Sequence, residues 1–67
     1  MKASTHERKA AEAKRMAREH ALHANAHLRS GDLAAAAHQF WMAGEYASTA
    51  HDEAKAARRA AKARDGL

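Results

Sequence analysis

Histidine is the residue type in this sequence with the most chemistry to offer. The chain has six histidines in 67 residues. His23 and His27 are four positions apart, a spacing that places both side chains on one helical face where they can bind one metal ion. His20 shares this flank, and a chain reversal at Gly31 would bring His38 opposite His23. We favour the simpler interpretation, partly exposed histidines without metal or other cofactor, because no H-E-x-x-H or Glu-rich di-iron motif accompanies them.

Basic residues gather at the two ends of the chain. Residues 20–50 carry a net charge of −1, whereas residues 1–19 carry +3 and residues 51–67 carry +2. A dense basic patch could bind the phosphates of a nucleic acid. The alternative, which we favour, is a solvated helical face, because no aromatic residue lies among the basic ones to stack on a base. The densest run is KAARRAAKAR, with Lys55, Arg58, Arg59, Lys62 and Arg64.

Large apolar side chains are few, and several are adjacent. Of the apolar residues, 21 are alanine. Phe40, Trp41 and Met42 are consecutive, so on a helix they point in three directions and one partner helix cannot cover them all. If Phe40 lies between two helices, Trp41 faces one flank and Met42 with Tyr46 faces the other. We therefore predict a protein interface that contains Phe40, Trp41, Met42, Tyr46 and Met16.

The elements that must position these residues are predicted to be helices. Proline is absent, and alanine, lysine, arginine and glutamate are good helix formers. Ser4 and Glu7 form a capping-box pattern that predicts a first helix over about residues 5–29. Gly31 suits the left-handed position that ends a helix, and Asp32 suits the N-cap of the next. The chain is thus predicted to be a single helical domain, residues 1–67, with a turn at 30–32 and a second helix over about 33–64.

Small residues on each helix form a stripe that predicts a close antiparallel hairpin. Eight large apolar side chains cannot easily offset the entropy of ordering the whole chain, so we expect two hairpins to pair into a dimeric four-helix bundle. On the first helix the stripe is Ala10, Ala13, Ala17, Ala21, Ala24 and Leu28. On the second helix it is Leu33, Ala36, Phe40, Ala43, Ala47, Ala50, Ala54, Ala57 and Ala61.

A compact three-helix bundle is the alternative to this hairpin. It requires the second helix to break between Gly44 and Thr49, with Thr49 capping a third helix. Asp52 and Glu53 would then lie in the first turn of that helix, where carboxylates complement the helix dipole. We prefer the continuous helix because the alanine stripe crosses the proposed break in phase.

The region around the turn resembles a tetratricopeptide repeat. In GDLAAAAHQFWMA, Gly31, Leu33, Ala36, Phe40 and Ala43 have the spacing of that motif. The resemblance covers about half of the chain, and it implies a helical hairpin that binds other proteins or peptides. The Trp and Leu-Gly of the motif's first helix are missing, and only one repeat fits.

These observations favour a small self-associating protein-interaction module, an adaptor or an inhibitor of a larger protein. The sequence lacks a nucleophile elbow, a phosphate-binding Gly-rich loop and paired carboxylates, so we expect no enzyme activity. It also lacks cysteine, a signal peptide and a long apolar run, so we expect a cytoplasmic protein without a membrane anchor. The partners expected are a second copy, in a homodimer, and another protein. Nucleic-acid binding and a histidine metal site are the alternatives, and the alanine and arginine bias indicates a bacterial or phage source.

Overall fold

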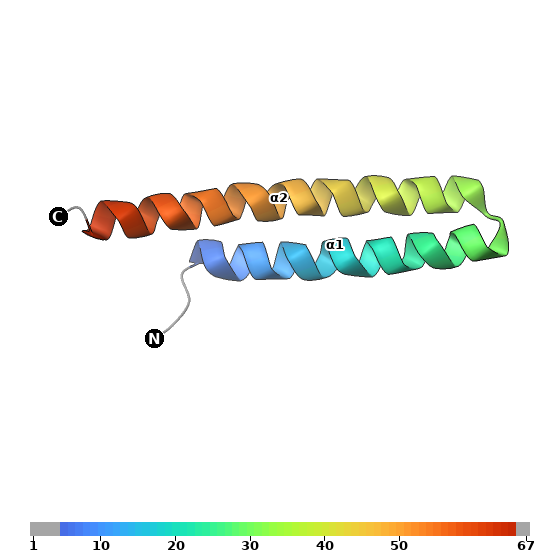
Figure 1. The fold of residues 1–67 in the computed structure, drawn as a ribbon, viewed down its shortest axis with the longest axis horizontal. Coiled ribbons are helices and arrows are strands. Elements are labelled where there is room, and N and C mark those ends of the chain that lie inside the picture. Colours follow the sequence, from blue (N-terminus) through green and yellow to red (C-terminus); the bar gives the residue numbers. More distant parts are fainter. Residues whose placement is uncertain (1–4, 66–67) are drawn as a thin grey trace.

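The chain folds into two long antiparallel helices joined by a tight turn (Figure 1). The structure is a computed structural model that describes the backbone of residues 5–65 and the side chains of residues 5–63. Helix α1 spans Thr5–Ser30 and helix α2 spans Leu33–Asp65. They run side by side, and α2 extends beyond the start of α1 at the open end of the hairpin. The prediction of an all-helical hairpin is confirmed.

The turn is built from two capping arrangements that meet at Gly31 and Asp32. Gly31 has a φ of 84°, a conformation that costs glycine little because it has no Cβ. Its N–H bonds the carbonyl of Leu28 at 3.1 Å, and the N–H of Asp32 bonds the carbonyl of His27 at 2.9 Å. This pair of bonds is the Schellman motif. The carboxylate of Asp32 then accepts the N–H of Ala35 at 3.1 Å and caps α2.

Helix α2 does not break as the three-helix alternative requires, so that alternative is wrong and the preferred continuous helix is confirmed. Helix α2 is continuous through residues 44–49. Instead of capping a new helix, the Thr49 hydroxyl donates to the carbonyl of Glu45 at 3.1 Å, within the same helix. A single glycine, Gly44, lowers helix propensity without interrupting the backbone hydrogen bonds. Ser4, the predicted cap of the first helix, lies outside the described residues.

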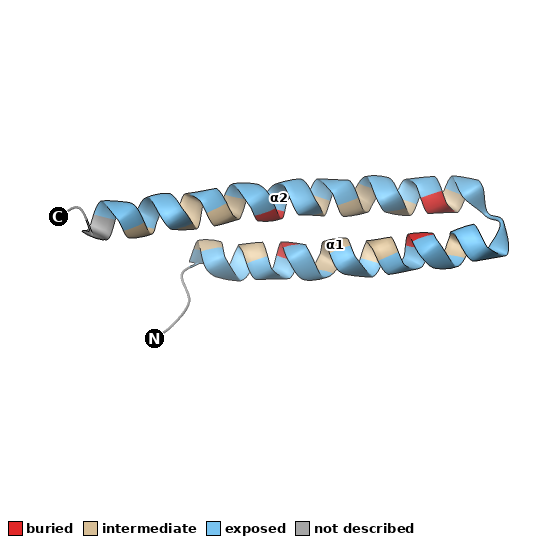
Figure 2. Cartoon of the chain, in the orientation of Figure 1, coloured by how far each residue is buried: buried red, intermediate tan, exposed pale blue. Residues whose placement is uncertain are grey.

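The core between the helices consists of small side chains. Among the described residues the buried apolar ones are Ala13, Ala24, Ala36 and Ala50. Figure 2 shows the buried positions on the facing sides of α1 and α2, with the remaining surface largely exposed. The alanine stripes therefore supply close approach between the helices. They bury little apolar area, because alanine carries one methyl group.

Two large residues of the predicted stripe on α2, Leu33 and Phe40, lie at the edge of the contact between the helices. Leu33 is 67% exposed and Phe40 is 44% exposed, so the prediction that both lie between the helices is wrong. Ala36 and Ala50 of the predicted stripe are buried, and Ala43, Ala54, Ala57 and Ala61 are half-buried as predicted. Gln39, Tyr46 and Glu53, which recur every seven residues, are half-buried as well, beside the predicted stripe. On α1, Leu28 is likewise 44% exposed, contrary to the predicted stripe. The physical reason is that polar side chains bridge the two helices along one edge of the seam, by which we mean the contact between α1 and α2.

Candidate interaction site

Histidine side chains of α1 make the hydrogen bonds that bridge the two helices. His6 Nδ1 lies 2.6 Å from the carboxylate of Glu53. His20 Nδ1 lies 2.6 Å from the side-chain oxygen of Gln39, and its ring is stacked on Tyr46 at a centroid distance of 5.4 Å. Hydrophobicity alone does not predict these contacts, because Gln39 and Glu53 are polar. The pattern in the sequence that could have indicated them is the seven-residue spacing of Gln39, Tyr46 and Glu53.

The histidines predicted as weak metal ligands point to different partners. His20 faces Gln39, and its ring meets that of His23 edge-on at 6.3 Å. His38 lies on the exposed surface, with its ring 6.4 Å from Trp41, and His27 is half-buried near the turn. In the described part of the chain no group of three or more His, Cys, Asp or Glu residues is placed to hold a metal ion.

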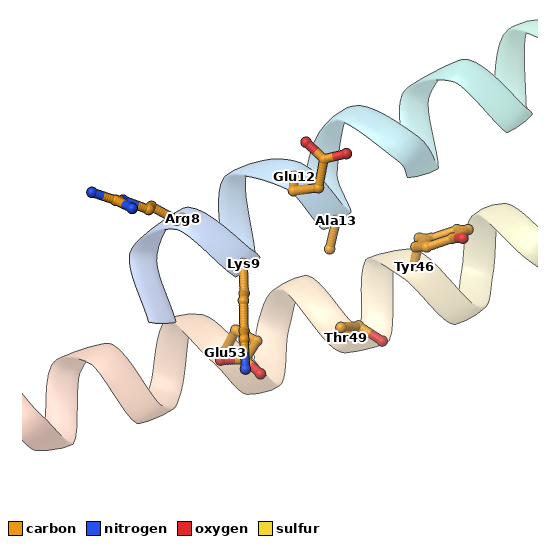
Figure 3. A pocket seen from close by; sticks show the side chains of 7 residues that line it. All are labelled: Arg8, Lys9, Glu12, Ala13, Tyr46, Thr49 and Glu53. Atoms are coloured by element: carbon orange, nitrogen blue, oxygen red, sulfur yellow. The ribbon is translucent and has the colours of Figure 1, made fainter. Parts of the chain in front are cut away.

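The two flanks of the hairpin seam differ in chemistry. Ala47 and Thr49 are two positions apart on α2, which places them about 200° apart around the helix, on opposite flanks. The flank of Thr49 carries a shallow depression lined by residues of both helices, and in Figure 3 the Lys9 side chain extends toward α2 beside Glu53. The lining residues are Arg8, Lys9, Glu12, Ala13, Tyr46, Thr49 and Glu53.

The flank of Ala47 is lined mainly by alanine and carries two adjoining depressions, which share Lys14 and Ala54. We call this flank the groove face. Its polar lining residues are Glu7, Lys14, His51 and Arg58, and Lys14 lines both depressions. Its alanines are Ala10, Ala11, Ala17, Ala47, Ala50, Ala54, Ala57 and Ala61.

The five residues predicted as a protein interface separate into three groups. Phe40 lies at the edge of the seam, seven residues before Ala47 and therefore on the groove face. Trp41, 64% exposed, lies on the outer side of α2, away from α1. Met16, Met42 and Tyr46 are half-buried. Their role as a protein interface stays a prediction.

The predicted basic residues of α2 lie together on its exposed surface. Lys55, Arg58, Arg59 and Lys62 line one shallow depression. None of their side chains forms a hydrogen bond or ion pair with another described residue. The side chain of Arg64, the fifth predicted residue, lies outside the described part.

One basic side chain of α1, Arg15, is paired with two carboxylates, in contrast to the basic cluster of α2. The guanidinium of Arg15 donates to the carboxylates of Glu12 and Glu19. The hydrogen bond to Glu12 and the negative charges of both carboxylates raise the pKa of Arg15 above its ordinary value. The positive potential that a phosphate would meet is therefore stronger on α2 than around Arg15.

Comparison of the chain with protein-family models, with curated proteins and with solved structures gives no match. Neither described helix combines the length and apolar character needed to cross a membrane.

Proposed function

We propose that the chain is a small self-associating helical module that binds other proteins, as an adaptor or an inhibitor of a larger protein. The observation that carries this proposal is the contrast between its core and its surface. The buried apolar residues among those described are four alanines, whereas Leu22, Leu28, Leu33, Phe40 and Trp41 are 44–67% exposed.

This contrast leaves the isolated hairpin with little buried apolar surface. A fully buried leucine or phenylalanine contributes about 1.5–3 kcal/mol, which is the scale of free energy needed to offset chain ordering. In the isolated hairpin these side chains stay largely in water. A second copy that covers Leu33 and Phe40 would recover this free energy and form a four-helix bundle. The resemblance around the turn to a tetratricopeptide repeat supports the same class of function.

Trp41 is the residue we assign to contact with a different protein. It lies on the outer side of α2 and stacks on His38, so a partner hairpin that covers Phe40 leaves it accessible. Tryptophan is enriched among the residues that dominate binding free energy at interfaces.

Sedimentation across protein concentration, at low and high salt, tests self-association. The monomer has a mass of 7.3 kDa, and we expect a dimer that persists at high salt because apolar contacts are not screened. The melting temperature should rise with protein concentration, because dimer formation stabilises the folded state. A helical monomer at every concentration, with a constant melting temperature, would overturn the proposal.

Nucleic-acid binding is the second candidate, and the exposed cluster Lys55, Arg58, Arg59 and Lys62 favours it. The prediction is retention on duplex DNA at low salt and release as salt rises, because binding displaces counterions. Changing Arg58 and Arg59 together to alanine should abolish retention. The matched control is Arg8→Ala with Arg18→Ala, which removes the same charge from α1. Equal retention of the Arg58/Arg59 variant would reject this function.

A further inference from the structure

The groove face is divided into a bulky half and a small half. On α2, one column of side chains repeats every seven residues: Leu33, Phe40, Ala47, Ala54 and Ala61. Side chains at this spacing share one face of a helix. Its two large members lie near the turn, and its three alanines run toward the open end. Across the seam, Leu28 of α1 lies beside the turn on the same flank, seven residues after Ala21 and fourteen after Lys14.

Projections and hollows therefore occupy opposite halves of the same face. Leu28, Leu33 and Phe40 are 44–67% exposed and project near the turn. The two depressions toward the open end are lined mainly by alanine. A half-turn about an axis that lies in the contact plane, perpendicular to the helices and near the middle of the face, places the projections of one copy over the hollows of another. A surface that complements itself under such a rotation is what a two-fold dimer requires.

Charge favours the same orientation. The segments at the open end, residues 1–19 and 51–67, carry +3 and +2, and residues 20–50 carry −1. An antiparallel pair places the basic end of each copy beside the slightly acidic turn half of the other. A parallel pair would bring both basic ends together, where like charges repel.

The face is large enough for a stable dimer. The Cα atoms extend over 55 × 19 × 11 Å, and the two larger dimensions span the plane of the hairpin. A standard protein interface takes about 800 Å² from each partner. One flank of the hairpin therefore offers enough surface for a second copy.

We propose that two copies pair antiparallel through the groove face, with Leu28, Leu33 and Phe40 of each copy filling the alanine-lined hollows of the other. This inference rests on the self-association proposed above, and adds the surface and the orientation. The occupant of the groove is thus a second copy of this chain. The flank of Tyr46 and Thr49, and the exposed Trp41, remain outside the contact.

The surface is tested with two neighbouring substitutions. Ala47 and Ser48 are both small and exposed on α2, but Ala47 lines the groove and Ser48 is turned about 100° away from it. We expect Ala47→Glu to weaken the dimer at least about tenfold, because it buries a carboxylate in an apolar contact. Ser48→Glu, which changes the charge equally, should leave the dimer unchanged. An Ala47→Glu variant that dimerises normally would overturn the proposed surface.

The orientation is tested with a spin label at Ser30, beside the turn. The chain has no cysteine, so Ser30→Cys gives a single attachment site on an exposed residue. Helix α1 has 26 residues and is therefore about 39 Å long. The antiparallel dimer places the two labels about 40 Å apart, whereas a parallel dimer places them within roughly 20 Å. These distances are separable by pulsed dipolar spectroscopy.

The outcomes distinguish the two proposals. A dimeric mass with a distance near 40 Å supports the antiparallel pairing. A dimeric mass with a short distance overturns the orientation and leaves self-association standing. A monomeric mass without dipolar coupling overturns both. Circular dichroism of each variant is the control, and we expect the helix content to stay unchanged.

Discussion

His6 and Glu53 join the two helices near the open end, with Nδ1 and Oε2 2.6 Å apart. His20 and Gln39, the other bridging pair, are separated by the same distance, 2.6 Å. From the first pair to the second the chain advances fourteen residues on α1 and retreats fourteen on α2. Because both pairs belong to one antiparallel register, a shift of α2 along α1 would break both contacts at once. The two polar pairs thus define how far α2 is shifted along α1. The regularly spaced alanines alone would allow several such shifts.

The His6–Glu53 contact should show a measurable coupling. We expect the changes His6→Ala and Glu53→Ala to be non-additive by about 0.2–1 kcal/mol in the free energy of unfolding, the range for partly exposed ion pairs. The measurement is a double-mutant cycle by urea unfolding. Pairing His6→Ala with Asp52→Ala, a change at the neighbouring exposed carboxylate, provides the control and should be additive. Full additivity of the first pair would show that His6 and Glu53 do not fix the register of the two helices.

The two glycines within the described residues should respond to alanine in opposite directions. Gly31→Ala should destabilise the hairpin by about 1–2 kcal/mol, because Gly31 has a φ of 84°, in the left-handed region that L-residues avoid. Gly44→Ala should stabilise it by about 0.5–1 kcal/mol, because Gly44 lies inside a helix and an added Cβ there meets no atom within 4 Å. Thermal unfolding at fixed protein concentration measures both. Destabilisation by Gly44→Ala would indicate that a second chain packs against that surface.

Of the two exposed aspartates Asp32 and Asp52, Asp32 should contribute more to the free energy of unfolding. Asp32 immediately precedes α2, whereas Asp52 lies inside it. The carboxylate of Asp32 caps Ala35, so Asp32→Ala should lower the free energy of unfolding by about 1 kcal/mol. Asp52→Ala, an exposed change in the interior of α2, should have an effect within about 0.5 kcal/mol. Equal effects of the two substitutions in chemical denaturation would show that the cap contributes little.

The His20–Gln39 pair should be replaceable by two apolar residues. Nε2 of His20 is buried and has no hydrogen-bond partner among the described residues. Gln39→Leu alone leaves Nδ1 unpaired as well, and should cost about 1–3 kcal/mol. Adding His20→Leu removes both unpaired nitrogens and should restore the melting temperature to the wild-type value or above. A double variant as unstable as Gln39→Leu would mean that stacking of His20 on Tyr46 is the larger contribution.

The sequence alone predicts the helices and the turn between them. It does not predict which face of α2 is turned toward α1. Alanine-rich composition, Gly31 and Asp32 determine local structure through backbone conformation and capping, which act within a few residues. On α2, two neighbouring heptad columns, Leu33–Phe40–Ala47 and Gln39–Tyr46–Glu53, could each have faced α1. Hydrophobicity favours the first column. The tertiary structure selects the second, because His6 and His20 on α1 supply hydrogen-bond partners for Glu53 and Gln39. That choice turns Leu33 and Phe40 outward and creates the apolar face on which the proposed dimer depends.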